Sequence, residues 1–408
     1  MQINLEKRSD YLALLLGQSE RIQLSSSDDP AEVVAGLRAG APGERKTVLL
    51  LGSNGFVGMH LLHELLVREE VGRVIALVRP TAEMSGRERI DDRAQHLRMS
   101  LPNLGRLEVL EGAFTRPQMG LSAPAYTELV EVVDVVINAA GSTDHSLPYA
   151  YYRRETILPM FRLLEFCLTG RLKALHIIGS VGCEVYTQWR DFLRVGFFNC
   201  GYSRMKWVTK HIVRQLHGRS VPIHMYLPSF VLGSRHTAYR DPGMQYSFWQ
   251  MLWYAGQIGK MWDCGDKPIP VVSGDVLARC VLDNVLAGEP APLVYPAQPL
   301  HSQEVAELFG WEHIPWEEFR SALQRRFSLR PARWAWSHPV SSLLEAVRHL
   351  MYTRTLFPKH LPQIIKSISE ASEASFATTR SDVPLLQVVG MCAENNYMFK
   401  RMLKEKAP

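Results

Sequence analysis

The segment Leu50-Leu51-Gly52-Ser53-Asn54-Gly55-Phe56-Val57-Gly58 decides the fold of this chain. It ends a short apolar run and opens a helical pattern. Glycines spaced as GxxGxxG let a backbone turn tightly and approach a pyrophosphate, which then faces the free N–H groups of the helix. The strand before and the helix after favour a dinucleotide-binding loop over a plain tight turn. The residues expected to contact the cofactor here are Gly52, Ser53, Asn54, Gly55, Phe56, Val57 and Gly58.

Outward from this loop, short apolar runs alternate with helical patterns. The runs are Thr47–Leu51, Val74–Val78, Leu107–Leu110, Val132–Ile137, Leu175–Ile178 and Ile223–Leu227. Strands that alternate with helices predict βαβ units and a parallel sheet with helices on both faces. The predicted fold class is α/β, a Rossmann-type doubly wound parallel sheet followed by a mostly helical C-terminal substrate lobe.

The pattern changes after about residue 234, and three parts are expected. They are an N-terminal extension (1–45), a dinucleotide-binding Rossmann domain (46–234) and a mostly helical lobe (235–408) with some return to the sheet near 268–290. Helical periodicity in the lobe predicts helices over Phe248–Ile258, Trp316–Phe327, Val340–Met351 and Leu361–Ala371.

Composition excludes several classes of protein. The 408 residues are 46% hydrophobic, enough for a sizeable core, and the net charge of +5 comes without a block of like charges. Nucleic acid is therefore not expected as a partner. The six cysteines are scattered, with no CxxC pair and no histidine at zinc-ligand spacing, so we expect free thiols, no metal site and a cytoplasmic location. No apolar run approaches the roughly 18 residues that a membrane span needs.

Two other strand ends are expected to contact the cofactor. Arg79 lies 21 residues after Gly58, where an enzyme that uses NAD usually has an acid on the ribose, and no acid is adjacent in sequence. A guanidinium suits the 2′-phosphate of NADPH instead, although an ordinary surface arginine is the plainer interpretation. The fourth run ends in small residues that let the backbone run close to the cofactor. These residues are Asn138, Ala139, Ala140 and Gly141.

A candidate reaction centre follows the fifth run. Ser180 ends that strand, where parallel sheets bind ligands, and Tyr202 and Lys206 are four apart on one helix face. A nearby ammonium lowers the pKa of a phenol, which can then pass a proton to a developing alkoxide. A structural serine and a surface Tyr/Lys pair are the alternatives. A hydrolase nucleophile elbow is disfavoured because Ile178 stands where its first glycine belongs.

With these residues in view, the chain resembles the extended short-chain dehydrogenase/reductase superfamily. Within it, the chain looks most like the thioester reductase domains of nonribosomal peptide and polyketide synthetases and of carboxylic acid reductases. Besides the glycine loop, the resemblance rests on Leu77-Val78-Arg79, Asn138-Ala139-Ala140, Leu147-Pro148-Tyr149 with Arg153, Gly201-Tyr202 through Lys206-Trp207-Val208, and Gly274-Asp275-Val276. It implies that Ser180, Tyr202 and Lys206 are catalytic. The chain departs from the pattern at Thr156, where Asn is usual, and at Leu227-Pro228-Ser229, where Arg-Pro-Gly is usual.

The resemblance implies NADPH-dependent reduction of an acyl thioester to an aldehyde, with reduction to the alcohol left open. The acyl group would arrive on the phosphopantetheine arm of an acyl or peptidyl carrier protein, or as acyl-CoA. Four aromatic residues after residue 234 wall that site or simply fill the core: Phe248, Trp249, Trp253 and Tyr254. The residues alone leave open a ketone or sugar-nucleotide dehydrogenase or epimerase, a thioester-releasing cyclase that uses no hydride, and a cofactor-sensing binding protein.

Overall fold

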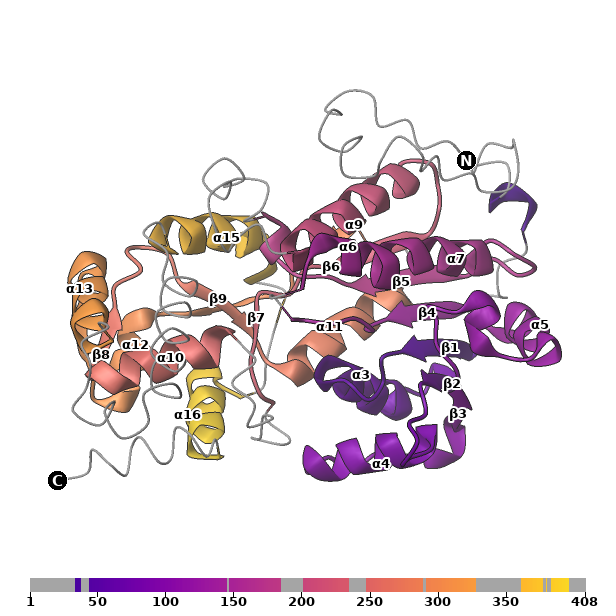
Figure 1. Cartoon of the computed structure of the whole chain (residues 1–408), viewed down its shortest axis with the longest axis horizontal. Helices are drawn as coiled ribbons and strands as arrows, with labels where there is room; N and C mark the ends of the chain where they lie inside the picture. Colours follow the sequence, from indigo (N-terminus) through magenta and orange to yellow (C-terminus); the bar gives the residue numbers. More distant parts are fainter. Residues whose placement is uncertain are drawn as a thin grey trace, which may run out of the picture.

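A seven-stranded parallel sheet, enclosed by helices, lies beside a smaller body of helices and short strands (Figure 1). The structure is a computed structural model. It describes residues 34–37, 44–144, 147–184, 201–234, 247–288, 291–327, 361–376, 379 and 383–395. The predicted helix over Val340–Met351 and nearly all of the N-terminal extension lie outside these residues.

The strands of the main sheet run in the order β3-β2-β1-β4-β5-β6-β10, and every pair is parallel. Their bounds are β1 Lys46–Leu51, β2 Val71–Val78, β3 Leu107–Glu111, β4 Val135–Asn138, β5 Ala174–Ile178, β6 Ile223–Tyr226 and β10 Leu293–Val294. The predicted doubly wound sheet is confirmed. The order reverses between β1 and β4, so their carboxyl ends flank the crevice where such sheets bind ligands.

The fourth strand begins three residues later than predicted. The sequence predicts strand for the whole apolar run from Val132, but Val132 is the last residue of α5 (Ala123–Val132). Ser122 caps that helix by accepting the N–H of Ala125. The N–H of Val133 still donates to the carbonyl of Leu129 at 3.2 Å. Val132 and Val133 are therefore part of the end of the helix and not of the strand.

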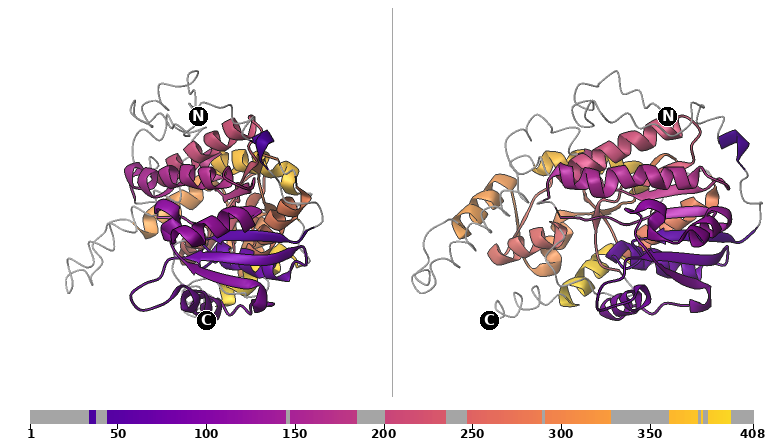
Figure 2. Two further views of the ribbon diagram at one scale, coloured as in Figure 1. Left: turned by 90° about the vertical axis from the view of Figure 1, so that its right-hand side faces the viewer. Right: turned by 45° about the vertical axis from the view of Figure 1, so that its right-hand side comes forward.

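Both faces of the sheet are buried, which explains why its strands are almost continuously apolar. Leu49 and Leu51 of β1 face one core, and Val48 and Leu50 face the other. On the first face lie α5, α6 (Tyr149–Tyr152), α7 (Leu158–Cys167) and α9 (Gly201–His217). On the second lie α3 (Phe56–Val67), α4 (Gly86–His96) and α11 (Gly274–Ala287). Figure 2 shows the same two layers from other sides.

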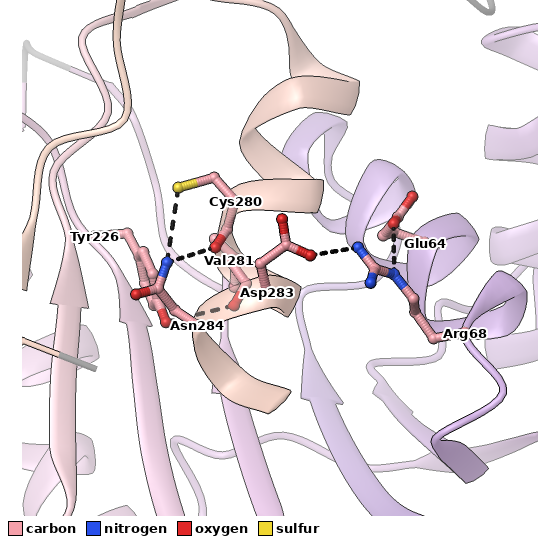
Figure 3. A network of polar contacts seen from close by, with 7 residues as sticks. All are labelled: Glu64, Arg68, Tyr226, Cys280, Val281, Asp283 and Asn284. Carbon is pink, nitrogen blue, oxygen red and sulfur yellow. Dashed lines mark hydrogen bonds and ion pairs between the residues drawn. The ribbon is translucent and has the colours of Figure 1, made fainter. Parts of the chain in front are cut away.

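Helices α3 and α11 are joined at their far ends by charged side chains (Figure 3). Arg68, at the end of α3, donates to Glu64 at 2.9 Å and to Asp283 of α11 at 2.5 Å. Asn284 donates back to the carbonyl of Cys280 at 2.7 Å. These contacts lie away from the carboxyl ends of the strands, so they hold the helix layer together at a distance from the ligand crevice.

The second body has its own core. Two small sheets, β11-β9-β7 and β12-β8, pack with five helices around a cluster rich in aromatic side chains. The strands are β7 Phe230–Val231, β8 Lys260–Trp262, β9 Ile269–Val272, β11 Gln298–Leu300 and β12 Glu312–Ile314. The helices are α10 Ser247–Ile258, α12 Ser302–Phe309, α13 Trp316–Arg326, α15 Leu361–Phe376 and α16 Leu385–Asn395.

The aromatic residues of α10 fill this core. Phe248, Trp249 and Tyr254 are all nearly inaccessible to solvent and belong to the buried cluster. Trp253, which is partly buried, packs edge-on against Tyr254 with ring centroids 5.0 Å apart. Of the two interpretations offered for these residues, packing is the correct one. Among the helices that the structure describes, none is long and apolar enough to cross a membrane.

Candidate active site

The glycine loop lies directly against the end of β4. Gly52 has φ +79°, and a Cβ built on it would lie 2.6 Å from the backbone nitrogen of Ala140. A Cβ on Gly58 would lie 1.9 Å from the carbonyl oxygen of Gly52. The N–H of Ala139 donates to the carbonyl of Leu51 at 3.0 Å. The structure therefore brings together the two segments expected to contact the cofactor, in a geometry that only glycine permits at these two positions.

This cradle fits a dinucleotide. Gly55 precedes α3 without a side-chain cap, and the first turn of that helix contains no acid. Its first N–H groups and positive dipole end are thus available to an anion. The hydroxyl of Ser53 is fully buried and has no hydrogen-bond partner among the residues that the structure describes. Phe56 is 5% exposed, and its ring packs against the ring of His60 in the core on the second face of the sheet.

Arg79 follows β2 at the surface, and a second arginine lies beside it. Arg89 of α4, which sequence reasoning missed, donates to the carbonyl of Arg79. No acid is adjacent to Arg79 in the sequence, but one lies on the neighbouring strand. Glu111 pairs with Val78 across β2 and β3, and its carboxylate accepts the N–H of Gly86 at 2.8 Å. The end of β2 thus carries two guanidinium groups and one carboxylate that is already hydrogen-bonded.

Lys206 joins α9 to the end of β5. Its ammonium donates to the carbonyl of Ile178 at 2.9 Å and lies 5.6 Å from the centroid of the Tyr202 ring. Burial lowers the pKa of Lys206 to about 8, and the nearby Cys183 opposes this shift. Since Ile178 is two residues before Ser180, this one hydrogen bond brings the helix face of Tyr202 and Lys206 to the strand end that carries Ser180.

Ser180 begins a tight turn at the end of β5. Its hydroxyl accepts the N–H of Gly182 at 3.1 Å, which orients the oxygen. The N–H of Val181 donates to the carbonyl of Pro228, beyond β6, at 3.1 Å. Residues 185–200, which lead from this turn to α9, lie outside the described residues. Within the described part of the chain, no group of three or more His, Cys, Asp or Glu side chains could hold a metal ion.

The start of α9 is fixed by a close backbone contact that the sequence reasoning did not identify. A Cβ on Gly201 would lie 2.3 Å from the backbone nitrogen of Tyr149, so only glycine lets α9 approach the start of α6. Tyr152 then packs edge-on against Tyr202 with ring centroids 6.0 Å apart, and its hydroxyl donates to the carbonyl of Asp144 at 2.6 Å. A glycine immediately before the tyrosine was the available signal.

Comparison with known proteins supports a common family. The sequence model described as male sterility protein, an NAD-binding family, matches residues 50–281. A nonribosomal peptide synthetase of Aspergillus hancockii, hkm10, is 27% identical over 216 residues, which is 48% of this chain and 20% of that protein. The matched segment therefore spans about a fifth of that relative's length.

Solved structures share the fold over nearly the whole chain. The terminal R domain of the myxalamid PKS-NRPS pathway superposes with a TM-score of 0.64 at 19% identity, covering 90% of this chain and 97% of that one. A thiolation-reductase di-domain from an archaeal non-ribosomal peptide synthetase gives 0.67 at 16% identity, covering 96% and 85%. The glycine cradle and the matched family model together identify the chain as a member of the male sterility protein family of NAD-binding oxidoreductases.

Proposed function

We propose that this protein uses NADPH to reduce an acyl thioester to an aldehyde. The observation that carries the proposal is the hydrogen bond from Lys206 to the carbonyl of Ile178, because it joins Tyr202 and Lys206 to Ser180 beside the cofactor cradle. A carbonyl placed there would meet two hydroxyl groups and a partly buried ammonium. These are the groups that a carbonyl reduction requires.

Each side chain has one role in the proposal. Ser180 and Tyr202 donate hydrogen bonds to the thioester oxygen, and Tyr202 passes it a proton as negative charge develops. Lys206 holds the nicotinamide ribose, and its positive charge stabilises the negative charge that develops on Tyr202 as the proton leaves. When bound, reduced nicotinamide supplies the hydride that adds to the carbonyl carbon. The C–S bond of the resulting hemithioacetal then breaks as its hydroxyl loses a proton, which gives the aldehyde and the free thiol.

The preference for NADPH rests on the end of β2. Arg79 and Arg89 lie together there, and the carboxylate of Glu111 already accepts the N–H of Gly86. A 2′-phosphate would find two guanidinium partners there, which form charge-assisted hydrogen bonds with phosphate oxygens. A cytoplasmic location is part of the same proposal, since the six cysteines of the sequence are scattered and form no CxxC pair.

A carrier-bound substrate is supported by the relatives. The chain resembles part of a peptide synthetase and superposes on a thiolation-reductase di-domain. We infer that the acyl group arrives on the phosphopantetheine arm of an acyl or peptidyl carrier protein, with acyl-CoA as the free equivalent. The second body beside the main sheet is the proposed site of contact with that arm.

The experiment is a comparison of one acyl group on three thiols: a loaded carrier protein, CoA and pantetheine. NADPH oxidation is followed by absorbance, and the products are identified by mass spectrometry. We expect an aldehyde with all three and the highest kcat/KM with the carrier. Equal kcat/KM values would remove carrier recognition from the proposal. Reduction of ketones but not thioesters, or release of acyl product without NADPH consumption, would refute thioester reduction.

A further inference from the structure

Three polar side chains from separate segments meet beside the Ser180 turn. Glu184, in the turn itself, forms an ion pair with Lys210 of α9. The same carboxylate oxygen accepts the hydroxyl of Tyr295, just beyond β10, at 2.8 Å. The side chains of Lys210 and Glu184 are only 7% and 13% exposed. Because both charges are largely removed from water, the geometry of their contact is fixed far more tightly than that of a surface pair.

Glu184 is rigidly connected to Ser180. The N–H of Cys183 donates to the carbonyl of Ser180 at 3.2 Å, and the N–H of Glu184 donates to the carbonyl of Val181 at 2.8 Å. Residues 180–184 therefore form one helical turn. Whatever holds the Glu184 carboxylate also holds the backbone that carries the Ser180 hydroxyl.

Lys210 connects the turn to the other half of the site. It lies one helical turn beyond Lys206 and two beyond Tyr202, on the same face of α9. On its other side the turn packs through Val181 against Ile364 and Ile368 of α15. This apolar contact permits sliding, whereas an ion pair fixes distance and direction. Together with the Lys206–Ile178 hydrogen bond, the Glu184–Lys210 pair is thus a polar contact that can set the position of Ser180 relative to Tyr202.

We propose that Glu184 and Lys210 are positioning residues: their ion pair holds Ser180 in register with Tyr202 and keeps the charge near Lys206 balanced. This inference rests on the proposed roles of Ser180, Tyr202 and Lys206. Stability alone is a weak explanation for the pair, because desolvation of two charges offsets much of their attraction. Precise placement of two hydroxyl groups on one substrate oxygen, in contrast, requires such a constraint.

The charges around Lys206 make the proposal testable by pH. Cys183 of the turn interacts electrostatically with Lys206, and the Tyr202 ring centroid lies 5.6 Å from its ammonium. The same Cys183 also has Glu184 and Lys210 around it, and Tyr295 donates to Glu184. Burial raises the pKa of the Cys183 thiol to about 12 and also raises the pKa of the Tyr295 phenol, so both are neutral near pH 7. The Lys210–Glu184 pair also has no net charge. Removal of either member leaves one buried charge near Lys206, with opposite signs in the two variants.

The experiment measures the pH dependence of kcat/KM, with any carbonyl substrate that the unmodified protein reduces, and of NADPH binding by fluorescence. The variants are Glu184→Gln, Lys210→Met and the charge swap Glu184→Lys/Lys210→Glu. The control is Asp134→Asn. Asp134 is 10% exposed and forms an ion pair with Arg171 at 2.8 Å. It lies at the amino ends of the strands, just before β4, whereas Ser180 lies at their carboxyl ends, just after β5. Thermal unfolding is recorded for every variant.

We expect Glu184→Gln to lower kcat by about tenfold or more. The alkaline limb of its kcat/KM–pH profile, where kcat/KM falls as the pH rises, should move about one pH unit towards lower pH, because the remaining Lys210 cation disfavours protonation of Lys206. Lys210→Met should lower kcat similarly but move the limb towards alkali. The swap should restore the position of the limb and most of kcat. Asp134→Asn should lower the unfolding temperature without moving the limb.

Shifts in the same direction for both single variants, or no shift in either, would overturn the positioning role, since a merely structural pair does not respond to the sign of the charge. Tyr295→Phe is the milder variant should the others not fold. It removes one hydrogen bond and should lower kcat about threefold to tenfold at unchanged NADPH affinity. Unchanged kcat in Tyr295→Phe would also contradict the proposal. NADPH binding reports on Lys206 without turnover, so failure to reduce thioesters would refute the proposed function and leave this test intact.

Discussion

Two turns at the carboxyl edge of the same sheet are built by different physics. The glycine loop after β1 is held by backbone contacts, with Gly52 against Ala140 and Gly58 against Gly52. The turn after β5 is held by side chains: Lys206 on the carbonyl of Ile178, and Glu184 on Lys210 and Tyr295. One turn depends on the absence of side-chain atoms, and the other depends on buried charges.

The two turns should therefore respond differently to mutation and to pH. Steric contacts do not titrate, so the cofactor cradle should respond to added volume and not to pH. Buried charges are sensitive to protonation and to the loss of a partner. Cofactor binding through the loop and proton transfer beyond β5 should therefore be separable by mutation and by pH.

The largest expected effect is at Tyr202. Tyr202→Phe keeps the ring that packs on Tyr152 and removes the proposed proton donor. We expect turnover to fall by roughly 10²–10⁴-fold with NADPH affinity nearly unchanged. Steady-state kinetics and a cofactor titration measure the two quantities. Tyr126→Phe, the same change in α5, is the control and should retain full turnover. Near-full activity in folded Tyr202→Phe would show that the assigned chemistry is wrong.

Ser180→Ala should have the next largest effect. One of the two hydroxyl donors to the substrate oxygen is lost and Tyr202 remains, so we expect a fall of about 10–10³-fold in kcat. The N–H of Gly182 also loses its acceptor. Single-turnover kinetics at saturating NADPH isolates the reduction step. A change confined to KM would assign Ser180 to substrate binding alone.

Gly52→Ala tests the steric half of the comparison. Its Cβ would overlap the backbone of Ala139 and Ala140, and the overpacking should weaken NADPH binding by about 10–100-fold at every pH. Gly265→Ala is a matched control, because Gly265 has a similar φ of +71° but open space where the Cβ would lie. Both variants bear the conformational strain, and only the first should lose cofactor affinity. Equal affinities, measured by calorimetry, would mean that the loop does not form the cradle.

Arg79→Ala should affect selectivity rather than turnover. A charge-assisted contact at an exposed site is worth about 1.5 kcal/mol, so NADPH affinity should fall about tenfold while NADH affinity remains constant. Arg89→Ala should behave in the same way, whereas Arg98→Ala, two residues beyond the end of α4, should not. If the unmodified protein binds NADH and NADPH equally, the 2′-phosphate has no partner here.

The smallest effect is the most informative about the charged turn. Lys206 has a pKa near 8 because burial disfavours its charged form. Its ammonium predominates below that pH and is lost above it, so NADPH affinity and kcat/KM should both decline as the pH rises through about 8. Titrations between pH 6 and pH 10 measure this limb. A limb near pH 10, as for a solvated lysine, would contradict the burial of this group.

Sequence patterns predicted six of the seven strands of the main sheet, the glycine loop and the segments that meet there, because these depend on local periodicity and on positions where only glycine fits. They did not predict β10 or most of the short strands of the second body. The contacts that join distant segments were not predictable in this way. Glu184 and Lys210 are ordinary charged residues in sequence, and Glu111 approaches Arg79 only across a strand pair. The aromatic residues of α10 offered two interpretations because core and channel walls have the same composition, and only packing separates them.

The most direct test of thioester reduction follows an isotope from the cofactor to the product. The protein is incubated with an acyl thioester and NADPH deuterated at C4 of the nicotinamide, using each stereoisomer in turn, and the product is analysed by mass spectrometry. The account predicts an aldehyde that carries one deuterium with one stereoisomer and none with the other. Tyr202→Phe should form the labelled aldehyde only at its slow residual rate. An acyl product without deuterium from either stereoisomer would contradict hydride transfer to the thioester carbon.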